Sequence, residues 1–166
     1  MNLKFLIRSR SQLVCRQAVL VAVLMTAVFL SLRASAALGG DLASVDADQK
    51  QLQSVKRSMR VAGNYTVYEI QTGYGTSIRE YVSPAGKVFG VAWDGPYLPD
   101  LRQILSSYYD QFEQAAAQRR QLHQRGPLFI EEPGLVVYSG GHMRAYSGKA
   151  YVPEELPQGV QPEEIR

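Results

Sequence analysis

Three consecutive segments in the middle of the chain concentrate hydrophobic residues between short breaks of glycine, proline and small polar residues, which predicts β-strands. They cover residues 65–71, 77–82 and 87–93, and each is rich in β-branched and aromatic side chains. The connections at 73–75 and 83–86 are short and contain glycine or proline, so neighbouring strands can pair only as antiparallel hairpins. We therefore expect a three-stranded antiparallel meander.

Apolar residues before the meander recur at helical spacing instead. The stripe consists of Val45, Leu52, Val55 and Met59. Acidic residues precede this stripe's centre and basic residues follow it, an order that suits the helix dipole. The pattern predicts an N-terminal amphipathic helix over about residues 44–58, and Gly63-Asn64 breaks it.

Helical spacing returns after the meander. Pro99 and Asp100 open this segment, and Gly126-Pro127 closes it. Its apolar stripe consists of Leu101, Leu105, Tyr108, Phe112 and Ala115. A coiled-coil seam is the alternative, but the stripe is too short for one. We expect one long helix that lies across the sheet.

The last part of the chain has the pattern of a second hairpin. Residues 135–138 and 143–147 are strand-like, and Gly140-Gly141 between them fits a two-residue turn. Residues 149–152 extend the last strand past a bend, whereas residues 128–134 are expected to be irregular.

These elements predict an α+β fold in a single small domain over residues 37–152. Its antiparallel sheet would have about five strands, from the three-strand meander and the C-terminal hairpin. The long helix would pack on this sheet, and the N-terminal amphipathic helix would precede it in the chain. Prolines and acidic residues predict an extended C-terminal tail over residues 153–166.

Residues 87–93 suggest which side of the sheet is buried. Alternation would place Phe89, Val91 and Trp93 on one face, and Gly90 and Ala92 on the other. The bulky face predicts a core in which Trp93 is buried between the sheet and the long helix. Exposure of Trp93 as a stacking surface is the alternative. The small residues leave room for something packed close to the backbone.

The first 36 residues have the pattern of a cleaved export signal. Basic residues come first, an apolar run of 15 residues follows from Ala18 to Leu32, and Ala34-Ser35-Ala36 is a small-x-small cleavage motif. A bilayer-spanning helix needs roughly 20 apolar residues, so an uncleaved anchor is the weaker alternative. We expect a Sec-type signal cleaved after Ala36, a periplasmic or secreted protein, and no permanent membrane anchor.

Removal of this signal changes the charge and the cysteine content. Five of the 18 basic residues lie in the signal, so the remaining chain has 13 basic and 15 acidic residues, a net charge of −2. No basic stripe remains for phosphates, and nucleic acid is not an expected partner. The only cysteine, Cys15, is also in the signal. We expect no disulfide, no cofactor and no metal site, since closely spaced histidine ligands are absent too.

His142 and Arg144 are the candidates for catalysis. They lie in Ser139-Gly140-Gly141-His142-Met143-Arg144, where glycine permits close approach of a ligand and histidine titrates near neutrality. An exposed hairpin tip that presents imidazole and guanidinium groups would suit a small hydrolase. The favoured alternative is a tight turn whose histidine makes only local hydrogen bonds.

Tyrosines in or beside the predicted strands are the candidates for binding. On an exposed sheet face they would form a platform for a sugar or a peptide, although cross-strand packing explains them equally well. With the hairpin residues, the candidate binding set is Tyr81, Tyr138, His142, Arg144 and Tyr146.

Several motifs resemble a known family. The clearest are Arg79-Glu80-Tyr81, Ser83-Pro84-Ala85-Gly86, Trp93-Asp94-Gly95-Pro96, Leu98-Pro99-Asp100-Leu101 and Ser139-Gly140-Gly141-His142-Met143-Arg144-Ala145-Tyr146. In this order, together with Ala37-Leu38-Gly39-Gly40, they resemble a family of exported Gram-negative bacterial proteins, domain of unknown function 2844. The resemblance covers essentially all of the chain after the signal. It implies an exported protein and implies no activity, substrate or catalytic residue.

Two functional hypotheses follow. The first is a non-catalytic binding or accessory module for an envelope protein, a peptide or a glycan. The alternative is a small periplasmic hydrolase-like enzyme that uses His142 and Arg144. A cleft-lining His142 beside an acid and a hydroxyl would favour the enzyme, and an exposed tyrosine-lined groove would favour the binding module.

Overall fold

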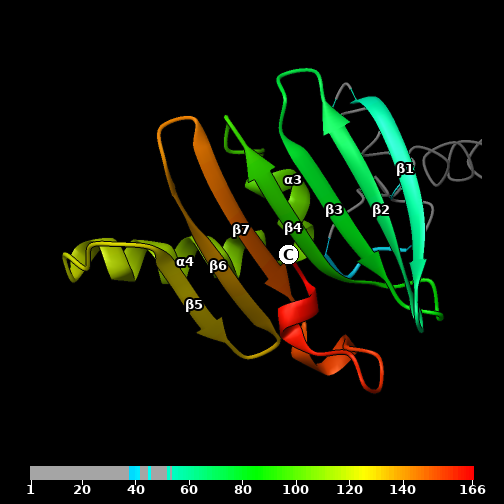
Figure 1. Ribbon diagram of the computed structural model, residues 1–166. Helices are drawn as coiled ribbons and strands as arrows, with labels where there is room; N and C mark the ends of the chain where they lie inside the picture. The colour runs from blue at the N-terminus through cyan, green and yellow to red at the C-terminus, as the bar shows by residue number, and fades with distance from the viewer. Residues whose placement is uncertain (1–37, 42–44, 46–51, 53) are drawn as a thin grey trace, which may run out of the picture. The chain divides into compact units, whose positions relative to one another are not determined.

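The computed structural model describes residues 38–41, 45, 52 and 54–166 (Figure 1). The predicted signal sequence over residues 1–36 and most of the predicted N-terminal helix lie outside the described residues. Val45 and Leu52, two members of that helix's apolar stripe, are buried.

One antiparallel sheet of seven strands dominates the fold, which is α+β as predicted. The strands are β1 (Ser54–Ala62), β2 (Tyr65–Thr72), β3 (Ser77–Val82), β4 (Val88–Gly95), β5 (Leu128–Glu132), β6 (Leu135–His142) and β7 (Ala145–Tyr151). Their order in the sheet is β1-β2-β3-β4-β7-β6-β5. The predicted meander is therefore β2 to β4, and the C-terminal hairpin joins it through β7.

The predicted count of five strands is wrong because β1 and β5 were not recognised. Residues 54–58 belong to β1, so the end of the predicted N-terminal helix is a strand. Gly63-Asn64 is its hairpin turn, since Ala62 pairs with Tyr65. Residues 128–132, expected to be irregular, form β5 at the opposite edge and pair with β6.

The predicted long helix is interrupted. It consists of α3 (Leu101–Leu105), a 3₁₀-helical turn at Ser106–Tyr108, and α4 (Tyr109–Gln121). Asp100 caps α3, because its carboxylate accepts a hydrogen bond of 2.9 Å from the Arg102 main-chain N–H. Ser106 interrupts the α-helical backbone with a φ of 44°. Both helices lie on the same face of the sheet, which we call the helix face (Figure 1).

Trp93 is buried on the helix face, as predicted, with 1% of its surface exposed. It belongs to the same buried cluster as Ile104, Leu105 and Phe112 of the two helices. Its cross-strand partner on β7 is Gly148, where an added Cβ would overlap the indole ring. Glycine at this position therefore leaves the space that the tryptophan ring occupies.

A β-bulge corrects the predicted face of Phe89. Tyr81 pairs with Gly90 and Val82 pairs with Val88, which leaves Phe89 as an extra residue in β4. Phe89 consequently packs in a second buried cluster on the other face, apart from Trp93. This second face also holds Gly90, as the alternation predicts.

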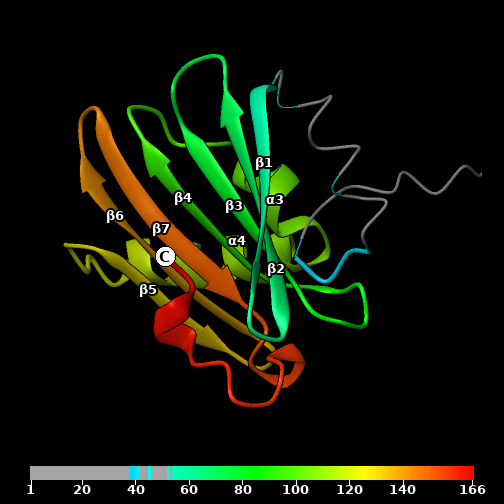
Figure 2. The same ribbon diagram turned by 45° about the vertical axis from the view of Figure 1, so that its right-hand side comes forward.

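The C-terminal segment covers part of that second face, which we call the tail face (Figure 2). Residues 153–166 contain two 3₁₀-helical turns, Pro153–Glu155 and Pro162–Glu164, in place of the expected extended tail. Val160 and Ile165 are buried there, and the Ile165 side chain fills the space above Gly90. The room expected beside the small residues of β4 is thus filled by the chain's own tail.

The C-terminal hairpin turns later than predicted. Gly140-Gly141 lies within β6, and the turn is Met143-Arg144, because His142 pairs with Ala145. Arg144 takes the left-handed φ of 67° that the turn requires. A Cβ on Gly141 would overlap the Ala145 main-chain oxygen, so glycine at position 141 reflects close strand contact and does not mark the turn itself.

Candidate functional site

A row of side chains crosses the tail face from one edge of the sheet to the other. Residues directly opposite one another in an antiparallel sheet point to the same face. The strand register gives the row Ser58, Glu69, Arg79, Ala92, Lys149, Tyr138 and Phe129, which takes one residue from each strand in its order across the sheet. Six of these seven side chains are polar or aromatic and can make hydrogen bonds or stacking contacts, whereas Ala92 in the middle of the row is buried in the same cluster as Ile165 of the tail.

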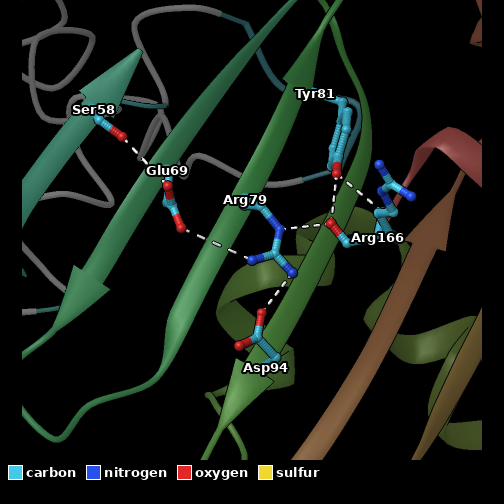
Figure 3. Close-up of polar contacts among 6 residues, drawn as sticks. All are labelled: Ser58, Glu69, Arg79, Tyr81, Asp94 and Arg166. Carbon is cyan, nitrogen blue, oxygen red and sulfur yellow. Dashed lines mark hydrogen bonds and ion pairs between the residues drawn. The ribbon is translucent and has the colours of Figure 1, made fainter. Parts of the chain in front are cut away.

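Arg79 is the centre of the polar network in this row (Figure 3). Its Nη2 lies 2.5 Å from Asp94 Oδ1, its Nη1 lies 3.9 Å from Glu69 Oε1, and its Nε donates a hydrogen bond of 2.6 Å to the Arg166 main-chain oxygen. Glu69 also accepts a hydrogen bond of 3.4 Å from the Ser58 hydroxyl. These contacts hold the guanidinium in place. At 3.9 Å the Glu69 contact is an ion pair and not a hydrogen bond, so some of the five N–H donors of the guanidinium stay available to a ligand or solvent.

Hydrogen bonds hold the C-terminal tail on the sheet beside Arg79. The Tyr81 hydroxyl donates to the Arg166 main-chain oxygen at 2.8 Å and accepts from the Arg166 main-chain N–H at 3.0 Å. Lys149 Nζ donates to the Pro162 carbonyl at 2.6 Å, and the Tyr65 hydroxyl donates to Glu164 Oε2 at 3.0 Å. Bonds from three strands thus fix the tail as one wall of the site.

Two hollows lie around the end of the tail. The larger, of about 740 Å³, is lined by Arg60, Tyr65, Arg79, Tyr81, Glu163, Glu164 and Arg166. The other, of about 420 Å³, is lined by Arg79, Trp93, Asp94, Ser147, Gly148, Lys149, Glu163, Ile165 and Arg166. Arg79, Glu163 and Arg166 line both, so the hollows share a border. Charges of both signs line them, which suits a polar ligand more than a strongly charged one.

A third, smaller hollow continues the polar surface toward β1. It has a volume of about 170 Å³ and is lined only by polar side chains, namely Lys56, Ser58, Glu69, Gln71 and Ser77. Two members of the row, Ser58 and Glu69, line this hollow. The polar surface therefore extends from β7 to β1.

An exposed aromatic pair ends the row on the side of β5 and β6. The rings of Phe129 and Tyr138 lie 4.6 Å apart between centroids, and these residues are 41% and 43% exposed. Lys149 Nζ lies 5.6 Å from the centre of the Tyr138 ring. Aromatic rings with one open face beside a hydrogen-bonding group are suited to stacking against an amphipathic ligand.

The environment of Tyr65 favours its neutral form. Burial raises the pKa of Tyr65 above its ordinary value of 10.0, and the hydrogen bond to Glu164 raises it further. Both effects disfavour a charged phenolate in contact with the tail. The hydroxyl therefore remains a donor to Glu164 up to alkaline pH.

The other candidate residues are not brought together. Tyr81 is buried beneath the tail, and Tyr138 lies on the open part of the same face. Tyr146 is two residues from Gly148, so alternation places it on the helix face. His142 and Arg144 lie exposed at the β6–β7 turn. The His142 Nδ1 lies 3.2 Å from the main-chain oxygen of its neighbour Met143.

No catalytic arrangement surrounds His142 in the part of the chain that the structure describes. Among the described residues, neither a carboxylate nor a hydroxyl side chain forms a hydrogen bond with its ring. Among residues 54–166 and the few described before them, no three His, Cys, Asp or Glu side chains are grouped to hold a metal ion. Within the same residues, no helix is long and apolar enough to cross a membrane.

Sequence reasoning missed Arg79, Asp94, Lys149 and Glu163. Arg79 alternates with apolar residues of β3, which is also the pattern of any solvated strand face. Its contact with Asp94 depends on the β3–β4 register and on the bulge, and neither follows from composition. The Pro/acid-rich character of residues 153–166 was visible, but it gave no sign that the segment packs on the sheet.

Comparison with known proteins identifies a family without a known activity. A family model described as "Protein of unknown function (DUF2844)" matches residues 34–165. No curated protein and no solved structure matches the chain. The match includes every described strand and helix, so it covers the candidate site as well. The chain belongs to the family DUF2844, whose members are proteins of unknown function.

Proposed function

We propose that this protein is an exported, non-catalytic binding module that holds a glycan of the cell envelope on its tail face. The single observation that carries the proposal is the row from Ser58 to Phe129, which combines a fixed arginine–carboxylate network with an exposed aromatic pair. The N-terminal export pattern and the net charge of −2 after its removal support the location and weigh against nucleic acid.

A ligand on a sheet face meets side chains only. The main-chain N–H and C=O groups of the inner strands already bond to neighbouring strands, so they are closed to a bound peptide. Sugar hydroxyls can bond to guanidinium, carboxylate and ammonium groups, and the C–H face of a sugar ring can stack on tyrosine or phenylalanine. The side chains of the row match this combination better than they match a peptide backbone.

The length of the row suggests an oligosaccharide. Neighbouring strands lie about 4.8 Å apart, so three strand spacings place Tyr138 on β6 roughly 14 Å from Arg79 on β3. The hollow of about 420 Å³ lies along this path, between Arg79 and Lys149. One sugar unit could then stack on the aromatic pair while another occupies the hollow beside Arg79.

Binding of soluble peptidoglycan fragments and of neutral glucan oligosaccharides, measured by isothermal titration calorimetry, tests the proposal. The variant F129A/Y138A removes two exposed rings and should weaken binding of the glycan that binds at least about tenfold. The matched control is Y74A/Y97A, since Tyr74 and Tyr97 form another exposed aromatic pair, with centroids 5.9 Å apart. Absence of binding to both probes, or equal loss in the control, would contradict the proposal.

A further inference from the structure

The two edges of the sheet differ in their protection against strand pairing. β5 has five residues between Pro127 and Pro133 and ends in Glu131-Glu132. Short length, flanking prolines and charges are the usual means by which proteins block an edge strand. β1 has nine residues and no proline, and it lies at the other edge of the sheet.

β1 also carries exposed apolar side chains. Val55, Met59 and Val61 are 70%, 62% and 69% exposed. Met59 pairs with Tyr68 and Val61 pairs with Thr66, which places both on the helix face. Apolar side chains on a long, unprotected edge strand are typical of a surface that accepts another strand.

The opposite face of β1 is basic. Lys56 pairs with Gln71 and Arg60 pairs with Val67, so both alternate with Ser58 on the tail face. β1 contains no acidic residue. On the helix face Arg57 lies over the Tyr68 ring, with its Cζ atom 4.9 Å from the ring centre. Side chains of an added strand would therefore meet Met59 and Val61 on one face of the sheet and the cations Lys56 and Arg60 on the other.

We propose that the outer edge of β1, which pairs with no other strand among the residues that the structure describes, binds an extended segment of another protein by strand addition. This segment alternates apolar with acidic residues. Main-chain hydrogen bonds to the edge would supply affinity, and side chains at alternate positions would supply specificity. Apolar residues of the segment would pack beside Met59 and Val61, and acidic residues would face Lys56 and Arg60. This surface adjoins the glycan site, since Arg60 and Lys56 also line its hollows. Strand addition is tested separately because its probes are peptides and not glycans.

Charge argues against a second copy of this chain as the occupant. Antiparallel pairing of two β1 strands about Ser58 would place Lys56 of each copy opposite Arg60 of the other. Like charges directly opposite one another destabilise strand pairing. The same cations that discourage self-association would attract an acidic strand.

The probe is a fluorescein-labelled nine-residue peptide of alternating valine and glutamate, and its counterpart has lysine in place of glutamate. Fluorescence anisotropy with the protein purified as the cell processes it should show the acidic peptide binding at least about tenfold more tightly. The charge-reversal variant K56E/R60E should invert this preference. The control K87E/R125E changes the net charge equally at exposed sites away from β1 and should keep the wild-type preference.

Two further acidic peptides test the hydrogen-bonding mode. Each is N-methylated at alternate residues, so that one peptide loses the N–H donors along one edge of the strand and the other peptide loses those along the opposite edge. One of them should lose binding at least about tenfold, because N-methylation removes the donors that face β1. Three results would overturn the proposal. The two methylated peptides could bind equally, the control K87E/R125E could lose the preference for the acidic peptide as fully as K56E/R60E does, or neither unmodified peptide could bind. A dimer in sedimentation that K56E/R60E abolishes would assign the edge to a second copy instead.

Discussion

Ile165 packs directly over Gly90, so that a Cβ added to Gly90 would lie 2.8 Å from the Ile165 Cδ1 atom. The contact joins the tail to the centre of the sheet across 75 residues of chain. Ile165 is fully buried, and the neighbouring Tyr81 hydroxyl holds the Arg166 main chain through two hydrogen bonds. The tail is therefore part of the folded core on this face, although its composition resembles that of a linker.

Valine at Gly90 should loosen the tail. A β-branched residue suits a strand, but its side chain would occupy the space of Ile165. We expect G90V to lower the free energy of unfolding by about 1–3 kcal/mol and to expose residues 153–166 to proteolysis. The double variant G90V/I165A should recover part of the loss, because it removes the obstructing side chain. Wild-type stability and protease resistance in G90V would show that the tail does not pack there.

Trp93 should behave as a core residue. It is the only tryptophan in the chain, so its fluorescence reports on this position alone, and we expect blue emission that resists quenching by iodide. Truncation in W93A should cost about 3–5 kcal/mol of unfolding free energy. W93F should cost less, because the buried indole Nε1 has no hydrogen-bond partner to lose. Red, readily quenched emission with an unchanged melting temperature in W93A would contradict the burial.

Stability should decline at alkaline pH through Tyr65. Its pKa is raised in the folded protein, whereas the unfolded chain has the ordinary value of 10.0. The stabilising contribution is therefore complete below about pH 10 and is lost as the pH rises through the folded pKa. Y65F should reduce this decline in urea titrations between pH 8 and 11. Some decline should remain, because burial also raises the pKa of Tyr108 and Tyr151.

The decline should be unchanged in Y97F, which removes an exposed hydroxyl outside the tail contact. If Y65F and the wild type lose stability in parallel above pH 10, the Tyr65–Glu164 bond does not contribute to holding the tail.

Cleavage of the signal has a direct test by mass. Intact-mass analysis of protein recovered from the periplasm should give a chain that begins at Ala37. Such a chain contains no cysteine, so a reductant should leave its melting temperature unchanged. Recovery of a chain that still contains Cys15 would contradict the predicted cleavage and the predicted absence of thiols.

The elements that sequence reasoning predicted correctly are those with an unambiguous period and clear turns. The strands β2 to β4 are rich in β-branched and aromatic residues, and the Ser83–Gly86 turn closes with a 2.9 Å hydrogen bond from the Gly86 N–H to the Ser83 carbonyl. The period was ambiguous in β1, because Val55 and Met59 fit a helix as well as a strand. Packing against β2 decided the conformation, and that contact is not visible in local spacing.

The candidate site was less predictable than the fold because it depends on register. The network around Arg79 joins β2, β3, β4 and the tail, and its members are up to 97 positions apart in the chain, from Glu69 to Arg166. One extra residue at Phe89 decides which side chains of β4 share the face of Arg79. Composition identified Tyr138 as a candidate, but it could not separate this exposed ring from the buried Tyr81.

Binding of a glycan to the tail face is tested most directly by chemical-shift mapping. Two-dimensional ¹H–¹⁵N spectra of the labelled protein, titrated with the glycan that gives the strongest calorimetric signal, report every perturbed amide. The largest changes should cluster at Arg79, Asp94, Tyr138 and Lys149 and at Glu163–Arg166 of the tail, with little change at Ile104 or Phe112 beneath the helix face. Changes confined to the β6–β7 turn around His142, or saturating shifts elsewhere with none in the row, would contradict the assignment of the tail face as the binding site.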